Sequence, residues 1–170
     1  MSHHQIRDAE IEDTFAVLRL NDAEVQWTSP IDPARLVYLA GYASYYRVIE
    51  VDGKVAGFLL AMCDGCGYQN ANLEWFEARY SNFLYLDRIV IATKCAGQKL
   101  GSALYRDIFS SAVTKGFGRV TCEYSWIPRN LASEIFHSRH GFQEVGQRLI
   151  AGTNKVLSMQ CRVLVAENDL

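Results

Sequence analysis

The segment of residues 83–124 limits the possible folds of this chain more than any other segment. Residues 83–92 are an apolar strand candidate, and residues 120–124 are a second extended stretch. Between them, residues 101–115 carry apolar side chains at helical spacing, namely Leu104, Ile108, Phe109 and Ala112. Two strands of one sheet that are joined through a helix pair in parallel with a right-handed crossover. The sequence therefore predicts a sheet that contains a parallel pair of strands.

Two helices are predicted near the start of the chain, after an extended stretch at residues 5–7. The first helix has Ile11, Phe15 and Leu18 on its apolar face. The second starts at Asp32-Pro33, because proline at the first helical position loses no useful N–H group, and runs to about residue 44. Its predicted buried stripe consists of Leu36, Val37, Leu39 and Ala40.

Two hairpins and one more helix complete the predicted elements. Residues 46–51 and 55–62 reverse at a tight turn, and residues 142–150 and 156–165 reverse at residues 152–154. Residues 131–139 predict a short helix whose apolar face comprises Leu131, Ile135 and Phe136. Residues 63–81 show no clear period and predict a long functional loop. Together these elements form a mixed α/β sheet.

Composition narrows the class of protein. The 170 residues, 49% of them hydrophobic, predict one domain over residues 1–170 with a core that needs neither disulfides nor metals. A net charge of -2 gives no broad basic surface, so nucleic acid and anionic membranes are not expected partners. The sequence lacks an apolar run resembling a signal peptide or a membrane span, which predicts a cytoplasmic location.

A C-x-x-C pair at Cys63 and Cys66 is the one hint of metal chemistry. Zinc sites usually need a second ligand pair, and the only candidates, His137 and His140, lie far downstream in another element. We therefore expect no metal. With five cysteines at irregular spacing, we expect reduced thiols.

The turn before the helix at residues 101–115 predicts an anion site. Glycines at Gly97 and Gly101 allow close approach of the backbone, and the first N–H groups of a helix have no internal partner. Neither the nucleotide pattern G-x-x-x-x-G-K-S/T nor the dinucleotide pattern G-x-G-x-x-G occurs in the chain. Enzymes of nucleoside triphosphates are therefore excluded.

This segment resembles the main motif of the GNAT superfamily of N-acetyltransferases, in which Q/R-x-x-G-x-G/A follows a strand and opens a helix. Ala96 stands at the first position, Lys99 at the fourth and Gly101 at the last, so two of the three depart from the pattern. A second match lies downstream, where Asn130, Ser133, Phe136-His137 and Gly141-Phe142 follow the spacing N-x-x-A-x-x-L/F-Y-x-x-x-G-F.

The resemblance implies a single-domain fold with a mixed, mostly antiparallel sheet, a central parallel strand pair and about four flanking helices. It implies acetyl-CoA or coenzyme A as the cofactor, and transfer of the acetyl group to an amine of a small molecule or a protein. The implied cofactor-binding residues are Ile89, Val90, Ile91, Ala96, Gly97, Gln98, Lys99, Leu100, Gly101, Ser102, Ala103, Asn130 and His137. His137 occupies the place of the tyrosine that protonates the departing thiolate in the family, and an imidazole can act as a general acid near neutral pH.

Direct transfer also needs a base that deprotonates the amine. Asp87 and Glu123 are the candidates, near the ends of the two parallel strands, although Asp87 can instead form an ion pair with Arg88. Tyr85 and Tyr124 are alternatives that act through water. Backbone amides around Ile91 are placed to hold the thioester carbonyl.

The acceptor pocket and the rival functions stay open at this stage. Aromatic residues that either wall this pocket or belong to the core are Tyr68, Trp75, Phe76 and Tyr80, with Tyr85 as a further substrate contact. One rival function is a GNAT-shaped sensor that binds acyl-CoA without turnover, which the changes at Ala96, Lys99 and His137 favour. Another is an unrelated α/β domain with structural glycines. A homodimer is also compatible with the sequence.

Overall fold

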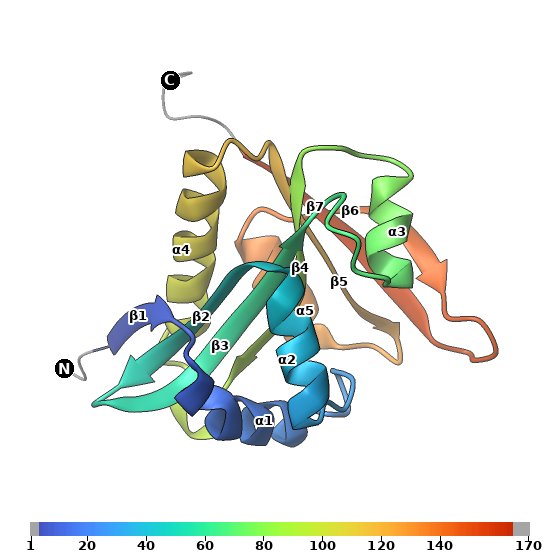
Figure 1. Ribbon diagram of the computed structural model, residues 1–170. Coiled ribbons are helices and arrows are strands. Elements are labelled where there is room, and N and C mark those ends of the chain that lie inside the picture. Colours follow the sequence, from blue (N-terminus) through green and yellow to red (C-terminus); the bar gives the residue numbers. More distant parts are fainter. Residues whose placement is uncertain (1–3, 165–170) are drawn as a thin grey trace.

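One sheet organises the part of the chain that the computed structural model describes, residues 4–164. Its seven strands run in the order β1-β2-β3-β4-β5-β7-β6 (Figure 1). Their bounds are β1 His4–Asp8, β2 Ala43–Val51, β3 Lys54–Cys63, β4 Phe83–Ile91, β5 Arg119–Ile127, β6 Gln143–Leu149 and β7 Val156–Val163. All neighbouring strands are antiparallel except β4 and β5, which are parallel. The predicted mixed, mostly antiparallel sheet is confirmed, whereas Val165 of the predicted last strand lies outside the described residues.

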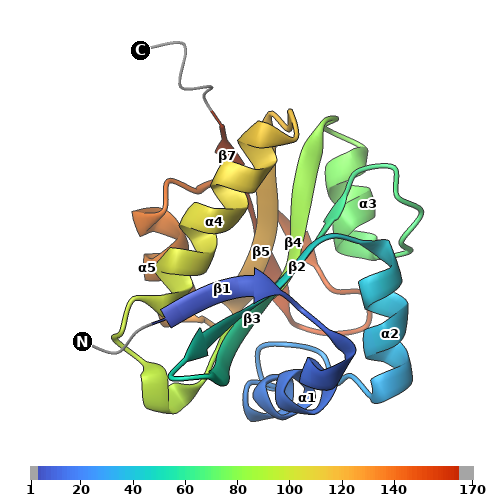
Figure 2. The same ribbon diagram turned by 60° about the vertical axis from the view of Figure 1, so that its left-hand side comes forward.

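Five α-helices cover the sheet within residues 4–164. They are α1 Thr14–Ala23, α2 Pro33–Tyr42, α3 Ala71–Glu77, α4 Leu100–Thr114 and α5 Leu131–Arg139. Figure 2 shows α4 and α5 on one face of the sheet and α1, α2 and α3 on the other. Each face has its own apolar core: Leu104, Ile108 and Phe142 belong to the first, and Leu39, Phe58 and Phe76 to the second.

The two N-terminal helices differ in how well the sequence predicted them. Helix α2 begins at Pro33, and the Asp32 side chain accepts a hydrogen bond from the backbone N–H of Arg35, as a good N-cap does. The predicted face of α1 is wrong: Ile11 and Phe15 are 70% and 72% exposed. The buried face of α1 instead contains Val17 and Asn21. In α2, Val37 belongs to the predicted buried stripe but is exposed.

The segment predicted as a long loop contains α3, so that prediction is wrong in part. The Asn70 side chain accepts hydrogen bonds from the backbone N–H groups of Asn72 and Leu73 and so caps the helix. Leu73 and Phe76, three residues apart, are fully buried against the sheet. A cap followed by two apolar residues is too short a signal to stand out in a segment of glycines and asparagines.

A β-bulge at Asp87 changes the direction of the side chains in β4. Leu60 of β3 lies opposite Arg88 and Ala61 opposite Leu86, so Asp87 has no partner in the register. Before the bulge, even-numbered residues of β4 face α4; after it, Ile89 and Ile91 do. Bulges often redirect side chains near functional sites.

Strands β4 and β5 pair only at their starts. The register joins Phe83, Leu84 and Tyr85 to residues 119–121, and residues 86–91 and 122–127 no longer pair with each other. Along this stretch, the edge of β4 that faces β5 keeps its backbone N–H and C=O groups free of a strand partner. The candidate functional site lies in the opening between the two strands.

Candidate active site

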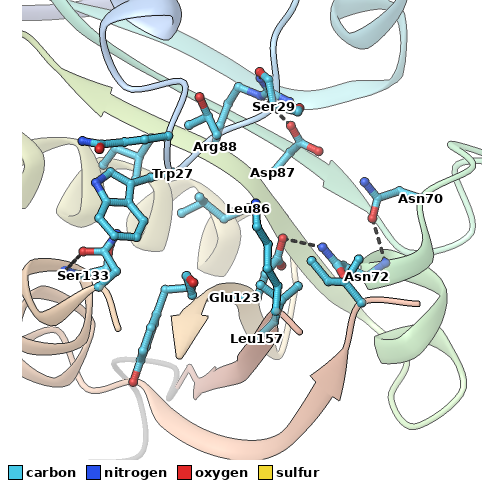
Figure 3. A pocket seen from close by; sticks show the side chains of 18 of the residues that line it. Trp27, Ser29, Asn70, Asn72, Leu86, Asp87, Arg88, Glu123, Ser133 and Leu157 are labelled. Carbon is cyan, nitrogen blue, oxygen red and sulfur yellow. Dashed lines mark hydrogen bonds and ion pairs between the residues drawn. The ribbon is translucent and has the colours of Figure 1, made fainter. Parts of the chain in front are cut away.

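A cavity of about 620 Å³ lies in this opening (Figure 3). Its lining comes from both parallel strands, from the segment between α1 and α2, and from the start of α5. Figure 3 shows Glu123 near the middle, with Asn72 on one side and Trp27 beside Ser133 on the other. Asp87, Glu123, Tyr124, Tyr85 and His137, which the sequence predicted as separate candidates, all line this one pocket.

Glu123 is the lining residue with the most unusual environment. Its Oε1 atom accepts hydrogen bonds from the Tyr85 hydroxyl (2.9 Å) and from Asn72 Nδ2 (2.7 Å). Its Oε2 atom is buried and has no hydrogen-bond partner within residues 4–164. Burial raises the pKa of this carboxyl to about 8, with the nearby Asp87 charge acting in the same direction. A carboxyl group that exchanges its proton near neutral pH is suited to general acid–base chemistry.

Asp87 is committed to partners instead. Its Oδ2 atom lies 2.7 Å from Arg88 Nε, and its Oδ1 atom accepts a hydrogen bond from the Tyr68 hydroxyl at 3.3 Å. Arg88 in turn donates to Asn21 Oδ1 (2.9 Å) and Ser29 Oγ (3.1 Å), which fastens the segment after α1 to β4. The ion pair with Arg88, which is the alternative to a catalytic role for Asp87, is therefore present. Both carboxylate oxygens of Asp87 have partners.

His137 is buried, with 5% of its surface exposed. Its Nδ1 lies 2.7 Å from the Ser133 carbonyl oxygen, which can only accept, so Nδ1 carries the proton. Its Nε2 then accepts from the Tyr105 hydroxyl at 2.9 Å. Burial lowers the pKa of His137 to about 4, so the imidazole is neutral at physiological pH. Both ring nitrogens are thus occupied inside the protein.

The predicted apolar face of α5 is wrong, because Leu131 and Ile135 are largely exposed while His137 faces inward. Tyr124 lies next to His137, with ring centroids 5.4 Å apart. Its phenol lines the pocket, and partial burial raises its pKa above the usual value. It therefore keeps its proton at neutral pH and can donate it.

The turn before α4 has the backbone form that an anion site needs. Gly97 has a φ of +79°, and a Cβ atom placed there would meet nothing within 4 Å. Lys99 is the N-cap, in the left-handed region with a φ of 61°. Within α4, the first backbone N–H group that has an acceptor is that of Ala103, which donates to the Lys99 carbonyl oxygen. The N–H groups of the first helical turn, before Ala103, therefore point out of the start of the helix.

Comparison with known proteins decides the family. The model of the acetyltransferase (GNAT) family matches residues 6–142. The chain belongs to the GNAT family. A search of curated proteins finds no match for it.

Solved structures share the GNAT fold at low sequence identity. Ard1 from Thermoplasma volcanium is 16% identical with a TM-score of 0.76, over 95% of this chain and 98% of that one. The ribosomal-protein-S18-alanine N-acetyltransferase from Escherichia coli is 16% identical with a TM-score of 0.73, over 99% of both chains. The structure of yncA from Salmonella typhimurium with its cofactor acetyl-CoA is 19% identical with a TM-score of 0.70, over 95% of this chain and 94% of that one.

The GNAT motif positions divide into backbone and packing roles. Lys99 stands where the motif has glycine, and its left-handed φ explains why the motif prefers that residue. At Gly101, an added Cβ would lie 3.1 Å from the Phe136 ring, so this glycine lets α4 approach α5 closely. Asn130 caps α5 through Oδ1, which accepts from the Ser133 N–H, and both residues line the pocket.

The residues predicted to hold the cofactor on β4 and at the start of α4 differ in where their side chains lie. Ile89 lines the pocket, whereas Val90 is buried in the core on the other side of β4. Leu100 and Ala103 are buried against the sheet. For these residues the backbone of β4 and of the first turn of α4 is the part that can contact a ligand.

Only part of the predicted aromatic wall lines the pocket. Tyr68 and Tyr85 do, while Phe76 is fully buried in the core. Trp75 packs edge-on against Phe76, with Arg79 above its ring, and Tyr80 lies under Arg119. Trp27, from the segment between α1 and α2, also lines the pocket.

Two residues that support Glu123 were missed in the sequence. Asn72 donates to Glu123 through Nδ2 and accepts from Arg148 Nη1 at 2.8 Å through Oδ1. The positive charge of Arg148 opposes the rise in the Glu123 pKa. These residues come from α3 and β6, so only the tertiary structure connects them.

Among residues 4–164, no three His, Cys, Asp or Glu side chains gather into a possible metal site, and Cys63 and Cys66 are free thiols. No helix in this part of the chain has the length and apolarity needed to cross a bilayer.

Proposed function

We propose that this GNAT protein transfers an acetyl group from acetyl-CoA directly to a primary amine of a small molecule or a protein. Glu123 is the observation that carries the proposal. It is a pocket carboxyl with a pKa of about 8 and a buried oxygen that has no partner within residues 4–164, beside two strands that have separated. Such a group can accept a proton from an incoming ammonium group and leave a neutral amine, which is the reactive form.

Acetyl-CoA fits the other features of the opening. It supplies a thioester, whose acetyl carbon the neutral amine attacks and whose sulfur then leaves. The amides at the start of α4 would bind its pyrophosphate, since this 15-residue helix directs its positive end there. The free backbone edge of β4 beyond Tyr85 would bind the pantetheine arm and the carbonyl oxygen.

The roles of the remaining pocket residues follow from their partners. Tyr124 is the proposed proton donor to the leaving thiolate, because this residue lines the pocket and its hydroxyl is protonated at neutral pH. Asp87 positions Arg88 and Tyr68. His137, neutral and bonded at both nitrogens, supports the fold of α5 beneath the site.

The test has two readouts. Coenzyme A and acetyl-CoA at millimolar concentration should raise the melting temperature, because a ligand that binds only the folded state stabilises it. A panel of amines should then release free thiol from acetyl-CoA at a rate that depends on the acceptor. Stabilisation without turnover across the panel would support the sensor instead, and no stabilisation would contradict both functions.

A further inference from the structure

The charged side chains that line the pocket do not balance. They are the cations Arg35, Arg88 and Lys155 and the carboxylates Asp87 and Glu123. Asp87 and Arg88 neutralise each other at 2.7 Å, and both side chains are almost completely buried. Glu123 can cancel at most one of the two remaining cations. The pocket therefore has an excess of positive charge in a chain whose net charge is -2.

Arg35 is an exposed side chain that lines the pocket and lies against two aromatic rings. Its guanidinium carbon lies 4.7 Å from the centre of the Tyr38 ring and 5.7 Å from that of Tyr68. One nitrogen, Nη2, donates to the Tyr68 hydroxyl at 3.3 Å. Within residues 4–164, no carboxylate lies within 4.0 Å of this guanidinium, and its other N–H groups have no protein acceptor. An oriented guanidinium with free N–H groups is the geometry that binds a carboxylate through two hydrogen bonds.

One more cation, Arg148, lies near Glu123, and neither it nor Lys155 has a carboxylate partner in the described part of the chain. Lys155, in the turn between β6 and β7, is exposed and lines the pocket. Arg148 of β6 is half-buried, and its recorded hydrogen bond goes to the Asn72 amide oxygen, which is neutral. Arg148 is thus connected to Glu123 through Asn72, while Arg35 of α2 and Lys155 of the β6–β7 turn add positive charge to the lining of the same pocket.

We infer that the acceptor is an amine that also carries a carboxylate, such as a free amino acid, bound with its carboxylate at Arg35 and its amino group toward Glu123. This inference rests on the proposed function and specifies the substrate class of the same site. A polyamine or a basic peptide would bring further positive charge to Arg35 and Lys155, which like-charge repulsion disfavours. The carboxylate of an amino acid supplies the charge that the pocket lacks.

The experiment compares each acceptor with a relative that lacks the carboxylate. The twenty L-amino acids, their carboxamides, putrescine and spermidine are offered with acetyl-CoA to the full chain. We expect at least one amino acid to exceed its own carboxamide about tenfold or more in kcat/KM. Arg35→Gln should raise the KM for that amino acid about tenfold to a hundredfold, with a small change in kcat and in the constants for the carboxamide. Arg35→Lys, which keeps the charge but loses the planar fork, should lie between.

Lys54→Gln is the matched control, because Lys54 is an exposed cation at the start of β3 and does not belong to the pocket lining. This variant should leave the kinetic constants for the amino acid and for its carboxamide unchanged. Equal use of carboxamides or polyamines would overturn the inference while leaving the proposed acetyl transfer intact. If no amine is acetylated, calorimetric titration of the amino acids into the coenzyme A complex decides instead: binding that Arg35→Gln weakens supports the inference, and absence of binding overturns it.

Discussion

The buried titratable groups on the two walls of the pocket differ in their hydrogen bonding. On the wall built by β5 and α3, Glu123 keeps one oxygen without a partner in the described chain. On the wall built by α5, His137 has both nitrogens bonded, to Ser133 and Tyr105. Burial favours the neutral form of each group, yet of the two only Glu123 keeps an atom without a hydrogen-bond partner in the described chain.

In the proposed function, this difference separates a reactive wall from a supporting one. The supporting wall packs densely, since Tyr105 contacts Phe136, His137 and Phe142 with ring centroids 4.8 to 5.8 Å apart. Of the departures from the GNAT motif, His137 lies on this wall, and Lys99 lies at the start of α4 on the same face of the sheet (Figure 2). The polar groups that can exchange protons with an acceptor lie on the other side.

Replacing the base is expected to have the largest effect. Glu123→Gln keeps the shape and an acceptor for the Tyr85 hydroxyl but cannot take up a proton. We expect turnover to fall about a hundredfold or more, with little change in the KM for acetyl-CoA. Steady-state kinetics at saturating acceptor measure this, and Glu74→Gln on the exposed surface of α3 is the control. Full activity in Glu123→Gln would erase the distinction between the two walls.

The pH dependence of stability should reveal the two groups with opposite signs. Glu123 has a folded pKa of about 8, above its unfolded value near 4.5, so its contribution is complete below pH 4.5 and is lost as the pH rises to 8. His137 has a folded pKa of about 4, below its unfolded value near 6.5, so its contribution is complete above pH 6.5 and is lost as the pH falls to 4.

Each effect should amount to about a few kcal/mol at most. Urea unfolding from pH 4 to 9 measures them. Relative to the wild type, Glu123→Gln should become more stable as the pH rises from 4.5 to 8. A constant difference over that range would mean that the Glu123 pKa is not raised by folding.

Removing the imidazole tests the supporting wall. His137→Phe should destabilise the protein by about 1 to 3 kcal/mol, because the fully buried Tyr105 hydroxyl loses its partner. Adding Tyr105→Phe should recover much of this loss, since both ends of the hydrogen bond are then apolar. Denaturant unfolding measures the cycle, and turnover should fall less than tenfold. A hundredfold loss of turnover in the folded variant would return the donor role to His137.

The sequence predicted backbone elements better than it predicted their buried faces. Helix α5 spans the predicted residues, but its apolar residues Leu131 and Ile135 face outward and His137 faces inward. Hydrophobic periodicity cannot find such a residue, because the hydrogen bonds that permit its burial come from Tyr105 on another helix. Asn21 on α1 is a second case, fully buried through its bonds to Arg88 and Ser29.

Part of the chemistry of the site could be predicted from the sequence. Glu123 and Asp87 could be proposed because they lie near the ends of paired parallel strands. The choice between them required the structure, since it depends on Arg88 binding one carboxylate and on Asn72 binding the other. The positive excess around the pocket likewise arises from α2 and the β6–β7 turn, which the sequence places more than a hundred residues apart.

The smallest expected effect concerns the departure at Lys99, on the supporting side. Its φ of 61° costs a residue with a side chain about 1 kcal/mol, which glycine does not incur. Lys99→Gly should therefore raise the free energy of unfolding by about 0.5 to 1 kcal/mol, net of the greater freedom of glycine in the unfolded chain, and the melting temperature by about 2 °C.

Gly97→Ala provides the opposite control, because Gly97 has a φ of +79° with open space around it and alanine there should lower stability by about 1 kcal/mol. Calorimetric scans of both variants, without cofactor, give the comparison. If Lys99→Gly were less stable than the wild type, the Lys99 side chain would be stabilising the turn by more than its backbone costs. The departure from the GNAT motif would then be a contact that this chain uses, rather than a strain that it tolerates.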